Sequence, residues 1–135
     1  MPELDFWVAG TPRPKGNAKR GWHGRIYAGD ANSKNWQIVV AVHAVEAMRG
    51  RTIAARDVPV EVQLEFVFKQ PKKPKYSDAV SARIADGDKL DRAVWDGMTG
   101  IVFEDDAQVV GWSGTKRYGD DPGVRIVVSW DDPVT

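Results

Sequence analysis

The clearest pattern of apolar and polar positions lies between residues 60 and 68. Apolar residues at every even position alternate with mostly polar residues at the odd positions. A period of two predicts a β-strand with one buried face. Shorter strands are expected at residues 4–9 and 25–28. Residues 108–118 and 124–130, on either side of the turn GDDPG, predict an antiparallel hairpin.

Two segments instead show helical patterns. Residues 34–49 follow two candidate N-caps, Asn32 and Ser33, and end before Gly50, a residue typical of the position just after a helix. Apolar residues occur on most sides of this segment, which predicts deep burial. Residues 88–99 carry apolar residues at helical spacing.

Together these elements predict an α+β fold with a mixed β-sheet and two main helices, forming one domain over residues 1–135. The length is sufficient for a hydrophobic core without disulfides or a structural metal.

Composition narrows the possible chemistry. The absence of cysteine excludes disulfides, thiolate metal sites and cysteine nucleophiles. No Walker A loop or GxGxxG motif is present, so no organic cofactor is expected. The N-terminus does not resemble a signal peptide, and no apolar run approaches the roughly 18 residues that span a membrane. We therefore expect a cytoplasmic protein without a membrane partner.

The charges sum to zero but are separated along the chain. Acidic residues gather at 86–91 and 104–106, whereas residues 12–25 and 69–75 are basic and contain no acid. Such separation suits a protein that binds a polyanion in some places and a metal ion in others, although a solvated mixed surface explains the charges equally well. The candidate DNA-binding residues in the basic segments are Arg13, Lys15, Lys19, Arg20, Lys69, Lys72, Lys73 and Lys75.

The candidate chemistry lies in the segment DGDKLDR. Asp86 and Asp88 are two positions apart at the start of the second helix, and in an extended stretch such residues point the same way. Mg²⁺ prefers oxygen ligands, commonly one or two carboxylates with water and substrate phosphate. A further acid from the motif EDD at 104–106 would complete the site, and Arg92, one helical turn after Asp88, would offset phosphate charge. Ordinary helix capping is the alternative explanation of the two aspartates.

The sequence DGDKLDRAVWDGMTGIVFEDDAQVV, followed by KRYG, resembles the RusA family of Holliday junction resolvases. The proline- and lysine-containing opening GTPRPKGNAKR is also similar to that family. The resemblance implies that Asp86, Asp88 and Asp106 are catalytic carboxylates that bind Mg²⁺, with Mn²⁺ as an alternative ion. Asp105 remains an alternative third ligand. Arg92 would be catalytic as a phosphate stabiliser.

The resemblance also implies a homodimer that cuts branched DNA, above all four-way junctions, by paired symmetric nicks. Lys116 matches a later family lysine, and Lys89 stands where the family commonly has asparagine; both are further candidate DNA contacts. Arg92 occupies a place where the family commonly has lysine, and arginine cannot readily give up a proton. A nuclease of wider branched-DNA range, a catalytically inactive junction-binding protein of the same fold, and an interaction module with merely solvated acids remain alternatives.

Overall fold

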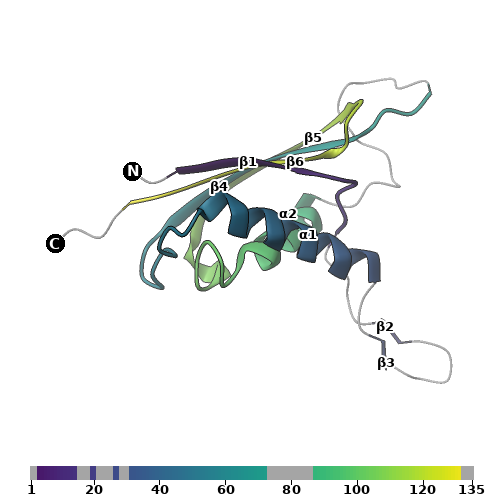
Figure 1. Cartoon of the computed structure of the whole chain (residues 1–135). Helices are drawn as coiled ribbons and strands as arrows, with labels where there is room; N and C mark the ends of the chain where they lie inside the picture. The colour runs from purple at the N-terminus through teal and green to yellow at the C-terminus, as the bar shows by residue number, and fades with distance from the viewer. Residues whose placement is uncertain (1–2, 15–18, 21–25, 28–30, 73–86, 132–135) are drawn as a thin grey trace.

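The computed structural model describes residues 3–14, 19–20, 26–27, 31–72 and 87–131. Its main element is a four-stranded sheet with two helices on one face (Figure 1). The α+β class, the mixed sheet and the two helices are therefore confirmed. The elements in chain order are β1 (Glu3–Ala9), β2 (Lys19–Arg20), β3 (Ile26–Tyr27), α1 (Ala31–Met48), β4 (Val60–Lys69), α2 (Gly87–Met98), the short 3-10 helix η2 (Asp106–Gln108), β5 (Val109–Gly119) and β6 (Gly123–Trp130).

The strand order is β1-β6-β4-β5, so the predicted hairpin of the last two strands is wrong. β4 lies between β5 and β6, parallel to the first and antiparallel to the second. All five even-numbered residues of β4 from Val60 to Phe68 are buried, as the alternating pattern predicted. The interior position of β4 gives it neighbours on both sides and buries more of its surface than an edge position would.

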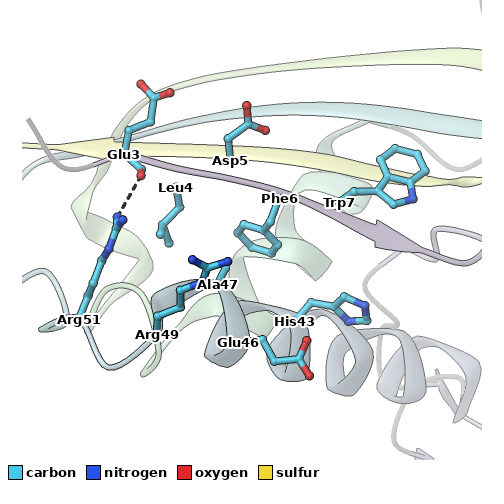
Figure 2. Close-up of a pocket in the computed structure, with 10 residues that line it drawn as sticks. All are labelled: Glu3, Leu4, Asp5, Phe6, Trp7, His43, Glu46, Ala47, Arg49 and Arg51. Atoms are coloured by element: carbon cyan, nitrogen blue, oxygen red, sulfur yellow. Dashed lines mark hydrogen bonds between the residues drawn. The ribbon is translucent and has the colours of Figure 1, made fainter.

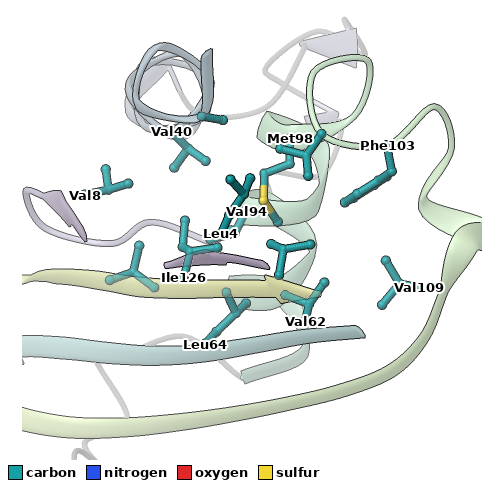
Figure 3. Packing of buried hydrophobic residues seen from close by; sticks show 14 of the residues in the cluster. Leu4, Val8, Val40, Val62, Leu64, Val94, Met98, Phe103, Val109 and Ile126 are labelled. Carbon is teal, nitrogen blue, oxygen red and sulfur yellow. The ribbon is translucent and has the colours of Figure 1, made fainter. Parts of the chain in front are cut away.

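The core fills the space between the helices and one face of the sheet. Figure 3 shows Val40 of α1 and Val94 of α2 above Val62 and Ile126 of the sheet, and each of these four is at most 1% exposed. Trp36 and Trp130 are buried as well. One sheet face is thus dry, and side chains on its other face remain accessible to water.

That outer face is polar and carries two of its own ion pairs. Arg125 donates to both carboxylate oxygens of Asp5, from Nε at 3.0 Å and from Nη2 at 2.6 Å. Arg117 Nε donates to Glu65 Oε1 at 2.6 Å. The hydrogen bond from Arg125 holds the pKa of Asp5 below its usual value. Both arginines are therefore matched by carboxylates, which disfavours this face as a surface for a polyanion.

α1 differs from its expectation in two ways. It begins at Ala31, so Asn32 and Ser33 lie inside the first turn and do not precede it. Only one side is deeply buried, at Trp36, Val40, Ala44 and Met48, whereas Ile38, Val42 and Val45 are 60, 51 and 57% exposed. The prediction of deep burial all round is wrong because a two-layer fold covers only the sheet side of the helix. Among the described residues no helix is long and apolar enough to cross a membrane.

This difference between the two sides of α1 can be measured. Val42→Glu is expected to change the free energy of unfolding by no more than about 0.5 kcal/mol, since its side chain meets water. Val40→Glu, which places a carboxylate in the core, is expected to cost about 3 kcal/mol or more. Urea denaturation of both variants tests this. Equal losses would show that the outer side of α1 is also packed.

Candidate active site

α2 carries the first part of the predicted site. It begins at Gly87, so Asp88 lies in its first turn and Asp86 immediately precedes it, outside the described residues. The expectation that Asp88 belongs to an extended stretch is therefore wrong by one residue. Asp88 still falls at a helix N-terminus, where the helix dipole and the unsatisfied backbone N–H groups stabilise negative charge.

Two contacts show how α2 lies along β5. The rings of Trp95 and Trp112 meet edge to face, with centroids 5.6 Å apart. One turn earlier, Asp91 lies so close to β5 that a Cβ atom at Gly114 would be 2.9 Å from its Oδ1. Four helical residues and two strand residues both advance about 6 Å. α2 and β5 therefore run antiparallel, and each two residues along β5 correspond to four residues back along α2. The next helix-facing residue of β5 after Gly114 is Lys116, which falls beside the N-terminus of α2.

The predicted cations divide into two groups. Lys89 and Arg92 are exposed on the first turns of α2, and half-buried Lys116 pairs in register with Phe66 on the helix-facing side of the sheet. These three lie around the N-terminus of α2. Of the basic segments, Arg13, Lys69 and Lys72 are exposed and Lys19 and Arg20 form β2, while Lys15, Lys73 and Lys75 lie outside the described residues.

The EDD motif forms a tight turn before β5. Asp105 is the N-cap of η2, and its Oδ1 accepts the Ala107 amide at 2.9 Å. That hydrogen bond, a second one with the Asp106 carboxyl and the charge of Arg56 hold the pKa of Asp105 below its usual value. Asp106 is exposed at the first position of η2. The capping role occupies Asp105, which favours Asp106 as the carboxylate available to a ligand.

Gln108 is a residue of this turn to which sequence patterns assigned no role. It is 5% exposed and is the single buried polar side chain among the described residues. Its Oε1 accepts the amides of Glu104 and Asp105, and its Nε2 donates to carbonyls of residues 54–58. The spacing DDxQ was its only signal, because its partners on the other side lie some fifty residues away.

The structure does not bring Asp88 and Asp106 together within one chain. α2 continues for ten residues beyond Asp88 to Met98, about 15 Å at 1.5 Å per residue. The chain then turns, with the Val102 amide bonded to the Met98 carbonyl, and Asp106 follows that turn. When two carboxylates bind one Mg²⁺, an oxygen of each lies about 2 Å from the ion, so the two side chains must be close neighbours. The described residues of one chain, which do not include Asp86, contain no group of three His, Cys, Asp or Glu able to hold a metal ion.

A groove between β1 and α1 lies away from these residues (Figure 2). It has a volume of about 390 Å³, and its lining includes both acidic and basic residues of α1 and the segment after it, among them Glu46, Arg49 and Arg51. Arg51 closes one end by donating to the Glu3 carbonyl at 3.1 Å. None of the predicted site residues lines this groove, so the candidate site is the N-terminal end of α2.

Two comparisons with known proteins cover nearly the whole chain. The family described as "Endodeoxyribonuclease RusA" matches residues 6–129, which include every predicted site residue. A protein of Bacillus subtilis (strain 168), "Uncharacterized protein YqaN", is 27% identical over 141 residues, covering 95% of this chain and 96% of that protein.

Proposed function

Because the chain belongs to the RusA endodeoxyribonuclease family, we propose that it is a Mg²⁺-dependent enzyme that resolves four-way DNA junctions by paired symmetric nicks. The observation that supports this best is the arrangement at the start of α2. There Asp88 of the DxD motif lies in the first turn of a helix, with Lys89, Arg92 and Lys116 around this N-terminus. Metal-dependent hydrolysis of a phosphodiester uses carboxylates that bind the metal ion together with cations that stabilise the phosphate charge.

The carboxylates fit Mg²⁺ in chemistry and number. Asp86 and Asp88 offer the hard oxygen ligands that Mg²⁺ prefers, and one or two protein carboxylates commonly suffice. When bound, the ion would polarise the phosphate and activate a water molecule. Arg92 presents a planar fork of N–H donors to phosphate oxygens, and an arginine does not readily give up a proton, so its role would be to stabilise charge and not to transfer a proton.

Asp106 fits the site only if two chains contribute to it. Since α2 separates it from Asp88 within one chain, we propose that Asp106 of one subunit joins Asp86 and Asp88 of the other in a homodimer. A two-fold axis then creates two equal sites. Two equal sites suit a substrate in which two strands are nicked symmetrically.

The basic segments are proposed to hold the arms of the junction. Arg13, Lys69 and Lys72 are exposed, and phosphate contacts of this kind release counterions from DNA. Junction binding should therefore weaken steeply between 50 and 200 mM salt, by about 10³-fold if six or more phosphates are contacted. Filter binding across that range measures the slope, and a flat response would contradict the phosphate contacts.

The deciding experiment compares a mobile four-way junction with linear duplex, in Mg²⁺ and in EDTA, for the wild type and Asp88→Asn. Paired nicks confined to the junction, present only with Mg²⁺ and lost in the variant, are expected. Tight junction binding without cutting by the wild type would identify an inactive junction-binding protein. Equal cutting of flaps and other branched forms would identify a nuclease of wider range.

The two acids of the EDD turn should respond differently to the same substitution. Asp106→Asn is expected to reduce nicking by about 100-fold or more, as a metal ligand would. Asp105→Asn keeps a side-chain oxygen that can cap η2 and should retain most activity. Nicking rates at saturating Mg²⁺ test both, and the reverse order would make Asp105 the ligand.

A further inference from the structure

We infer that Gln108 is a positioning residue that sets the orientation of Asp106, an inference that rests on the proposed metal role of Asp106. Gln108 lies two positions beyond Asp106, at the last residue of η2. Its side chain does not point to the surface with Asp106 but into the protein, where it is 5% exposed. A buried amide must have its hydrogen bonds satisfied, and Gln108 satisfies them entirely with backbone groups.

The oxygen of the amide organises the turn in front of Asp106. Gln108 Oε1 accepts the Glu104 amide at 2.8 Å and the Asp105 amide at 2.9 Å. The Gln108 backbone amide donates to the Asp105 carbonyl at 3.0 Å, while the Asp105 side chain caps the same turn. These contacts form a reciprocal capping box. They fix the backbone on both sides of Asp106 while its carboxylate stays exposed.

The nitrogen of the amide anchors this turn to a distant segment. Gln108 Nε2 donates to the carbonyls of Ala55 at 2.7 Å and Val58 at 3.0 Å, and lies 3.3 Å from that of Ala54. Ala54 is itself buried and bridged to Phe103, a fully buried core residue. The amide thus connects the Asp106 turn to the rigid base of β4, which begins two residues after Val58.

Only glutamine combines an acceptor for the Glu104 and Asp105 amides with a donor for the carbonyls of residues 54–58. Glutamate would direct acceptor oxygens at three carbonyls, and asparagine is one methylene too short to reach both sides. A group that orients a metal ligand without touching the metal typically changes metal affinity by about 10- to 100-fold when it is removed. A purely structural glutamine would lower stability and leave the affinity of the folded protein for metal unchanged.

Mn²⁺ binding, followed by the free-ion EPR signal well below the unfolding temperature, tests this role. Gln108→Met replaces the amide with an apolar chain of similar length, and its Mn²⁺ dissociation constant is expected to rise about 10-fold or more. Gln108→Asn, a milder change, decides the question if the methionine variant does not fold. The matched control is Val62→Ala, a core change in β4 that lowers thermal stability without touching the turn; its Mn²⁺ affinity should stay within about twofold of the wild type.

The outcomes separate this inference from the proposed function. If Asp106→Asn weakens Mn²⁺ binding while the Gln108 variants bind as the wild type does, Gln108 has no positioning role and the metal site stands. The inference is also overturned if Val62→Ala weakens binding as much as the Gln108 variants do, because loss of stability would then explain both. If Asp106→Asn has no effect, the proposed third ligand fails and the inference fails with it.

Discussion

A one-to-one mixture of Asp88→Asn and Asp106→Asn chains is expected to regain about a quarter of wild-type nicking, although each variant alone is inactive. The reason is the length of α2, which separates the two aspartates in one chain. In a mixed dimer, one site combines Asp88 of the second variant with Asp106 of the first, and both are intact. The other site carries both substitutions and is inactive.

Subunits should be exchanged by co-refolding, and the mixed dimer isolated through two different affinity tags. Nicking of a labelled junction then gives the activity of one site. The matched control mixes Asp86→Asn with Asp88→Asn; because these residues belong to the same half of the site, no mixed dimer has an intact site and no activity should return. If the first mixture also stays inactive after exchange is verified, Asp106 is not shared between chains.

The largest effect on stability is expected from Gly97→Val. Gly97 lies where α2 crosses α1, and a Cβ atom there would come within 2.9 Å of Val40 Cγ1 and 3.0 Å of the Gln37 carbonyl. Val40 is fully buried and the Gln37 oxygen belongs to the α1 backbone, so neither can yield without displacing the helix from the sheet. Overpacking of this kind, with a β-branched residue in a helix, should cost about 3 kcal/mol or more.

Urea denaturation measures that cost. The same substitution at Gly111 in β5 is the control, because the nearest atom to a Cβ there is Glu61 Cγ, at 3.4 Å on an exposed side chain. Gly111→Val should change the free energy of unfolding by less than about 1 kcal/mol, since valine is also favoured in strands. A Gly97→Val protein as stable as the wild type would contradict the close crossing of the two helices.

Elements whose burial repeats regularly along the chain could be predicted without the structure. The bounds of β4 and α2 were predicted within a residue or two. Alternation in a strand and helical spacing in a helix both indicate which face is buried. The DxD and EDD motifs were visible for a related reason: their members are neighbours in the chain. The family resemblance rested on the same local blocks, and the match over residues 6–129 confirms it.

Which elements pack against each other could not be predicted from local patterns, because such contacts join residues far apart in the chain. The apolar residues of α1 did not reveal that Ile38, Val42 and Val45 face away from the sheet, because that depends on what covers the helix. β5 and β6 are close in sequence yet both pair with β4. The separation of Asp88 from Asp106 follows from α2, whose ten residues after Asp88 extend about 15 Å from it. Gln108 bonds to carbonyls about fifty residues away, and contacts between such distant positions leave no periodic pattern in the sequence.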